Sequence, residues 1–212
     1  DTMQPITVPK EGLVLDEAES TVVRNGETLI KTTVTESDNA IQKAVSEALS
    51  KIQENTSSVT IRVASGEYNG DINIGASETS SYTVPKDFVL YVLADDSYSE
   101  PEAEDGIIDK STVTKTNSKG NAIINGNILI AHINVIMTGL YLSQGKTITV
   151  DDAELTYNGT VKDDNVAVDI ANSAKADTST VTINTGGGRD FVSLTGSGKE
   201  TTDKSTATVN TG

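Results

Sequence analysis

The chain has 212 residues, a formal net charge of −15, 35% hydrophobic and 4% aromatic residues, and no cysteine. The missing cysteines exclude a disulfide framework, thiolate metal sites and cysteine nucleophiles. The strong negative charge argues against a nucleic-acid partner, whose phosphates need basic patches, and no apolar run approaches the roughly 20 residues of a membrane span, so we expect no membrane insertion.

Residues 1–37 contain short apolar patches, among them Leu13-Val14-Leu15 and Leu29-Ile30. Asn25-Gly26 lies between two runs rich in β-branched residues, which is a strong hairpin signal. We therefore predict that residues 1–37 form an N-terminal extension of short strands.

Residues 38–54 carry the helical pattern of the chain. Apolar residues recur at a spacing of three or four, which places them on one helix face; they are Ile41, Ala44, Val45, Ala48, Leu49 and Ile52. Ser37 or Asp38 can cap the start by accepting a bond from a free backbone N–H. The pattern predicts an amphipathic helix over 38–54 whose apolar face covers the β-structure that follows.

The rest of the chain consists of short apolar bursts, several of them alternating with threonine, which is typical of strands with one buried and one wet face. The predicted strands include 59–63, 71–74, 88–93, 123–124, 128–130, 133–142, 147–150, 166–170, 181–183, 191–194 and 207–209. Residues 95–119 are polar and acidic with little periodicity, so we predict a loop there.

Two near-copies lie close to the C-terminus, STVTINTG at 179–186 and STATVNTG at 205–212, 26 residues apart. Repeats of this kind, rich in β-branched residues, predict stacked coils. Since the chain stops within the second copy, we expect the coils to continue beyond Gly212 in a longer parent protein.

The opening of the β-rich part is similar to that of a known family. Ile41-Gln42-Lys43-Ala44-Val45, then Ile61-Arg62-Val63 leading to Gly66-Glu67-Tyr68, and later Gly139-Leu140-Tyr141-Leu142 resemble the right-handed parallel β-helix proteins of the pectin-lyase-like superfamily. The resemblance, of the bacterial surface adhesin type, implies an all-β fold: a right-handed parallel β-helix (solenoid) over 38–212, with an N-terminal amphipathic capping helix over 38–54.

Gly186, Gly188 and Asp190 form the sharpest local motif, which resembles the calcium-binding nonapeptide of RTX proteins. Glycines allow a turn with positive φ, so that carbonyls and a carboxylate can converge on a hard cation. Calcium is therefore a candidate cofactor. RTX sites need tandem copies and this chain has one, however, so the pattern favours a glycine turn between two coils with Asp190 in water.

Catalytic groups are sparse in the sequence. His132 is the single histidine, and no orienting carboxylate is close to it in sequence, so we predict a partly buried or edge histidine. No acid–base constellation is evident around Asp169 or Asp190. Adjacent acidic pairs such as Asp151-Asp152 suit solvated charges. The resemblance thus carries over a fold without an active site.

These observations favour a non-catalytic fragment of a secreted or cell-surface bacterial protein, an adhesin or structural protein whose rigid rod displays loops. The expected partner is a ligand or glycan on a host or neighbouring cell, with self-association through the open end coil. One alternative is a carbohydrate-active enzyme (a polysaccharide lyase, hydrolase or epimerase) or its remnant. Another is a subunit of a surface layer or extracellular filament.

Overall fold

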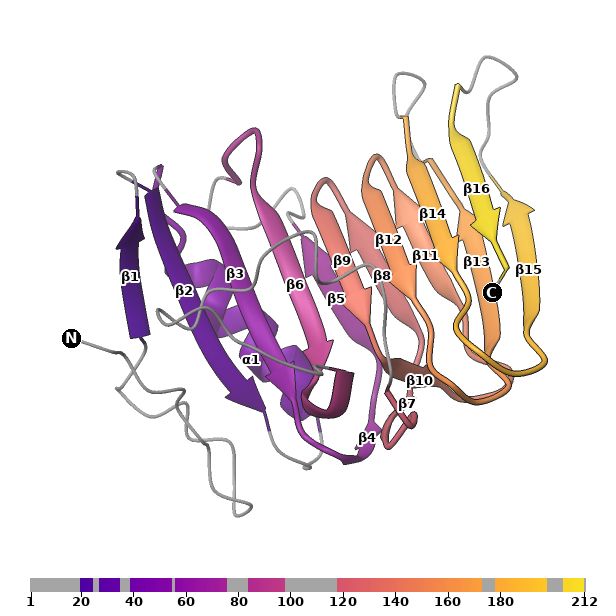
Figure 1. Cartoon of the computed structure of the whole chain (residues 1–212). Helices are drawn as coiled ribbons and strands as arrows, with labels where there is room; N and C mark the ends of the chain where they lie inside the picture. The colour runs from indigo at the N-terminus through magenta and orange to yellow at the C-terminus, as the bar shows by residue number, and fades with distance from the viewer. Residues whose placement is uncertain are drawn as a thin grey trace.

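The computed structural model describes residues 20–24, 27–34, 39–54, 56–75, 84–97, 118–172, 178–197 and 204–211, with the backbone alone for the strands before residue 39. The chain is mostly β, and its strands form three sheets beside one short helix (Figure 1). All strand pairs described are parallel except the first, which is an antiparallel hairpin. The predicted all-β class is therefore confirmed, and the stacked parallel sheets are compatible with a parallel β-helix.

The largest sheet has eight strands. In spatial order they are β1 (Ser20–Arg24), β2 (Glu27–Val34), β3 (Thr56–Val63), β6 (Val89–Ala94), β9 (Asn134–Thr138), β12 (Glu154–Asn158), β14 (Thr180–Asn184) and β16 (Thr206–Asn210). The hairpin predicted at Asn25-Gly26 is present as the β1–β2 pair, in which Arg24 faces Glu27; the two turn residues lie outside the described part.

The other two sheets are shorter. One contains β4 (Gly66–Asn69), β7 (Ala122–Asn125) and β10 (Leu140–Leu142). The other contains β5 (Ile72–Gly75), β8 (Ile128–Ala131), β11 (Ile148–Asp151), β13 (Asn165–Ile170) and β15 (Phe191–Gly196). The chain visits the three sheets in turn, from β3 to β4 to β5 and then back to β6. Each circuit therefore adds one layer to the stack.

The two near-copies near the C-terminus lie side by side. Thr180 pairs with Thr206 and Asn184 pairs with Asn210 in the parallel β14–β16 pair, an offset of 26 residues. The repeat thus marks equivalent positions in consecutive layers, as the sequence predicted. The β12–β14 pair has the same offset, since Asn158 pairs with Asn184. The β9–β12 pair differs, since Thr138 pairs with Asn158, 20 residues on.

The core lies between the sheets and is filled by inward-facing aliphatic side chains. Val135, Leu155 and Val181, for example, occupy the same register position of β9, β12 and β14 and are all buried. Strand β6 differs, because it is buried on both faces. Val89, Tyr91 and Leu93 form a second apolar cluster on its outer side, which explains why residues 88–93 form a continuous apolar run.

Helix α1 (Ala40–Ser50) lies at the N-terminal end of the stack, beside β2, β3 and β5 (Figure 1). The predicted apolar face is buried in the core from Ala40 to Leu49. The helix is shorter than the predicted range 38–54, because the Lys51 N–H donates to the Ala48 carbonyl at 3.2 Å and the Ile52 N–H to the Leu49 carbonyl at 3.3 Å, which closes the last turn. Its N-cap is Asn39, without a side-chain bond; Ser37 and Asp38 lie outside the described part.

The predicted loop 95–119 begins as a short 3-10 turn, η1 (Asp95–Ser97), and is largely outside the described residues. Its two ends are fastened together. Asp96 accepts hydrogen bonds from the Ser118 hydroxyl at 2.7 Å and from the Lys119 backbone N–H at 3.1 Å. In the described part of the chain, no helix has the length and apolarity needed to cross a membrane. The predicted division between 1–37 and 38–212 stays a prediction.

Candidate functional site

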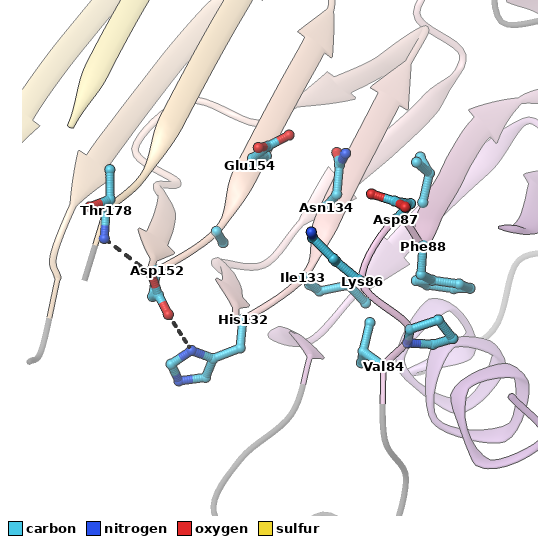
Figure 2. A pocket seen from close by; sticks show the side chains of 13 residues that line it. Val84, Lys86, Asp87, Phe88, His132, Ile133, Asn134, Asp152, Glu154 and Thr178 are labelled. Atoms are coloured by element: carbon cyan, nitrogen blue, oxygen red, sulfur yellow. Dashed lines mark hydrogen bonds and ion pairs between the residues drawn. The ribbon is translucent and has the colours of Figure 1, made fainter. Parts of the chain in front are cut away.

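An open groove of about 520 Å³ lies on the outside of the stack, where the chain turns into the eight-stranded sheet (Figure 2). Its wall consists of residues 84–89 on one side and of residues 132–134, 152–154 and Thr178 on the other. These segments come from four successive layers. Side chains that are far apart in sequence therefore share one surface.

The register of the sheets places the groove residues in rows. Ala131 faces Asp151 where β8 pairs with β11, and Asn134 faces Glu154 where β9 pairs with β12. His132 and Asp152 are therefore equivalent corner positions, and both have left-handed backbone, with φ of 56° and 45°. The shared corner conformation turns both side chains outward, one above the other.

His132 and Asp152 are in direct contact. The imidazole Nδ1 lies 3.1 Å from Oδ2 of Asp152, and Oδ1 of Asp152 accepts the Thr178 backbone N–H at 3.1 Å. Figure 2 shows this chain of three residues along the lower rim of the groove. The side chains of His132 and Asp152 are 45% and 41% exposed, so water screens the pair and its contribution to stability is below about 1 kcal/mol. Its consequence is orientation, because Asp152 fixes which edge of the imidazole faces outward.

Four other polar side chains of the groove are unpaired among the residues that the structure describes. Within the described part of the chain, the side chains of Lys86, Asp87, Asn134 and Glu154 have no hydrogen-bond or ion-pair partner. Figure 2 shows them turned toward the space between the two walls. Exposed hydrogen-bonding and charged groups that face one hollow are able to recognise a polar ligand.

The sequence did not reveal the contact between His132 and Asp152. The sequence predicts a partly buried or edge histidine at His132, and its side chain is 45% exposed; the carboxylate that orients it is not predicted. Asp152 lies 20 residues later, the same offset that separates Thr138 from Asn158. The repeat near the C-terminus reveals an offset of 26 residues, so neither a search among near neighbours nor a search at that offset finds this pair.

Gly186, Gly188 and Asp190 lie between β14 and β15, where their loop is stacked on residues 159–164. A Cβ at Gly186 would lie 1.8 Å from the Thr160 carbonyl oxygen, and Gly188 has φ of +106° with the Lys162 carbonyl 2.8 Å from the position of its Cβ. Oδ1 of Asp190 accepts the Asp164 backbone N–H at 3.0 Å. These contacts show why glycine is needed in this turn, and they give Asp190 a role in joining two layers.

Asp164, in the layer below, is buried. Its carboxylate accepts the Thr160 backbone N–H at 2.6 Å and the Thr160 hydroxyl at 3.0 Å. Burial raises the pKa of Asp164; the bonds from Thr160 oppose this rise, and the charges of Asp190 and Asp163 add to it. Burial, and after it the negative charge of Asp164, raises the pKa of Tyr157. The Tyr157 hydroxyl donates a hydrogen bond to the Leu140 carbonyl oxygen at 2.6 Å.

No three histidine or acidic side chains within the described ranges gather closely enough to hold a metal ion. Calcium at Gly186, Gly188 and Asp190 stays a prediction. Comparison with protein-family models, with curated proteins and with solved structures found no match to this chain. The resemblance to the pectin-lyase-like superfamily therefore stays an inference from the sequence.

Proposed function

We propose that the chain is a right-handed parallel β-helix and that it forms part of a non-catalytic, secreted or cell-surface bacterial protein that holds a ligand on a stiff rod. The right-handed sense follows from the near-universal handedness of parallel crossovers in one sheet. The α1 helix acts as the lid of the first layer, because it packs beside β2 where the two smaller sheets have no described strand.

The open groove is the observation that carries this proposal. A stack of layers with different offsets brings Asp87, His132 and Glu154 onto one face, and the layers hold that face rigidly through backbone pairing. Functional groups on a rigid scaffold lose little entropy on binding. An acidic, well-hydrated surface suits a protein that works outside the cell, since net charge keeps it soluble.

The proposal is tested by coating beads with the purified chain and measuring their retention under flow on cell surfaces and on glycan and protein layers. We expect retention on at least one surface, and we expect that soluble chain added in excess abolishes it. Beads that carry a heat-unfolded sample are the matched control. If beads that carry the native chain and beads that carry the unfolded chain are retained equally on every surface, display of a ligand-binding face is not the function.

A second candidate function, a carbohydrate-active enzyme, is favoured by one observation. The groove brings His132, oriented by Asp152, together with the free carboxylate of Glu154, and a base and an acid on one face are what general acid–base catalysis needs. Incubation with a panel of polysaccharides, with a His132→Ala variant as control, tests it. If new reducing ends or unsaturated products form with the parent chain and not with the His132→Ala variant, the function is that of a carbohydrate-active enzyme and not display.

The proposed function includes a calcium ion that binds the loop of Gly186, Gly188 and Asp190 and stiffens it. The expected result is a rise in the Tm of the chain in millimolar calcium, which magnesium does not reproduce and which Asp190→Asn removes. A Tm that is the same in calcium and in chelator would remove calcium from the proposed function.

A further inference from the structure

The charges of the groove are unbalanced. Asp87, Asp152 and Glu154 carry three negative charges against the single ammonium of Lys86, with His132 beside them. Asp152 is held by His132 and Thr178, whereas no partner within the described residues neutralises Asp87, Glu154 or Lys86. The groove therefore presents two open carboxylates in a chain whose formal net charge is −15, and this field attracts cations.

The positions of the two open carboxylates define the spacing that a partner must match. Glu154 begins β12, and Asp87 comes just before β6; β9 lies between these strands. Two strand spacings amount to about 10 Å across the sheet, and Asp87 is set back by two residues from Val89, which is level with Asn134 and Glu154. In an extended peptide, side chains three positions apart are separated by about 10 Å, and the long, flexible side chains of arginine and lysine span the remaining offset. One basic side chain can thus meet each carboxylate.

Asn134 pairs with Glu154 on one side and with Val89, two residues after Asp87, on the other. Figure 2 shows its side chain between those of Glu154 and Asp87. Its free side-chain amide offers both a donor and an acceptor to a peptide backbone that crosses the groove. Most small-molecule pockets are lined chiefly by apolar and aromatic groups. Here the phenyl ring of Phe88 is 2% exposed, so it presents no face on which a sugar ring could stack.

We infer that this groove binds an extended basic segment of a partner protein, with two arginine or lysine side chains on Asp87 and Glu154 and the peptide backbone on Asn134. Arginine suits the carboxylates better, because its planar fork makes two parallel hydrogen bonds to one carboxylate. The inference rests on the proposed display function, for which it names the chemistry of the ligand.

The test measures fluorescence anisotropy of labelled Gly/Ser-rich peptides that contain two arginines three positions apart, one arginine, or two citrullines. Citrulline keeps the shape of arginine without its charge. We expect the two-arginine peptide to bind at least about tenfold more tightly than either other peptide, because the two contacts act together.

Four single variants test which side chains of the groove bind the peptide. Glu154→Gln and Asp87→Asn should each weaken binding by about fivefold or more, whereas Lys86→Gln should strengthen it by removing a like charge. Glu67→Gln is the matched control, because Glu67 is exposed and belongs to a different sheet; its affinity should stay within about twofold of the parent. All four positions are exposed, and circular dichroism verifies that each variant is folded.

Equal losses in Glu154→Gln and Glu67→Gln would mean diffuse attraction to an acidic chain and would overturn the inference. Tighter binding of an amino-sugar oligomer than of the two-arginine peptide would also overturn it, in favour of a glycan. If coated beads are retained under flow while no basic peptide binds, only this inference fails. If the peptide binds but the beads never adhere to any surface, the proposed display function fails instead.

Discussion

The side-chain amide of Asn184 donates a hydrogen bond to Oδ1 of Asn158 at 2.7 Å. The same contact recurs in the next layer, where Asn210 donates to Asn184 at 2.7 Å, and in the layer before, where Asn158 donates to the hydroxyl of Thr138 at 3.0 Å. A row of three asparagine amides, which ends at the Thr138 hydroxyl, thus runs along the stack, and each member fixes the register of its neighbours.

Removing the middle of this row is expected to destabilise the protein. Asn158 is 1% exposed, and Asn158→Ala removes the donor to the Thr138 hydroxyl and the acceptor of the Asn184 amide. The expected cost is about 2–3 kcal/mol in the free energy of unfolding. Asn210→Ala, at the exposed end of the row, should cost less than about 1 kcal/mol. Urea denaturation measures both, and equal losses would show that the row does not act through burial.

Glycine at position 186 is expected to be essential for the stacking of two loops. In Gly186→Ala the new methyl group meets the Thr160 carbonyl oxygen, a backbone atom, at 1.8 Å. The layers must separate, which should cost about 1–3 kcal/mol or more. Gly187→Ala is the neighbouring control, because its nearest contacts are at 3.9 Å. Thermal unfolding of the two variants should differ clearly; equal Tm values would contradict the close approach.

Asp164 is expected to make the stability depend on pH. Its folded-state pKa lies above its ordinary value of 3.8, with burial as the main cause, so the folded chain holds this proton where the unfolded chain has lost it. The stabilisation by protonation is complete below the unfolded-state pKa and disappears as the pH rises through the folded-state pKa.

Asp164→Asn removes this titration and keeps an acceptor for the Thr160 N–H. The stability of the variant relative to the parent should therefore rise as the pH increases from the ordinary aspartate pKa of 3.8 through the raised folded-state pKa. Urea midpoints measured across this range test the prediction, with Asp163→Asn, an exposed neighbour, as the control. A relative stability that falls with pH would contradict the raised pKa.

The contact between His132 and Asp152 is expected to orient rather than to stabilise. A double-mutant cycle with His132→Ala and Asp152→Ala should give a coupling energy of about 0.2–1 kcal/mol, because both side chains are more than 40% exposed. Chemical denaturation of the parent, the two single variants and the double variant supplies the four values. A coupling above about 2 kcal/mol would show that water screens the pair less than its exposure implies.

Several elements could be predicted because their signals are local. The face of α1 follows from apolar residues three and four positions apart, and most strands follow from short apolar bursts. Strand β12 was missed, since Glu154–Asn158 contains only two aliphatic or aromatic residues, Leu155 and Tyr157. Its place in the sheet is fixed by neighbours on both sides, β9 and β14, which local sequence does not reveal.

The sequence by itself determined the class of the fold, the helix and the 26-residue repeat, because these depend on the periodicity of one segment and on near-identity between two. Only the tertiary structure decided which polar side chains meet. The distance along the chain from one layer to the next depends on the loops between them: it is 20 residues at Asn158 and 26 at Asn184 and Asn210. Backbone pairing between layers fixes those offsets, and with them the groove in which His132 meets Asp152.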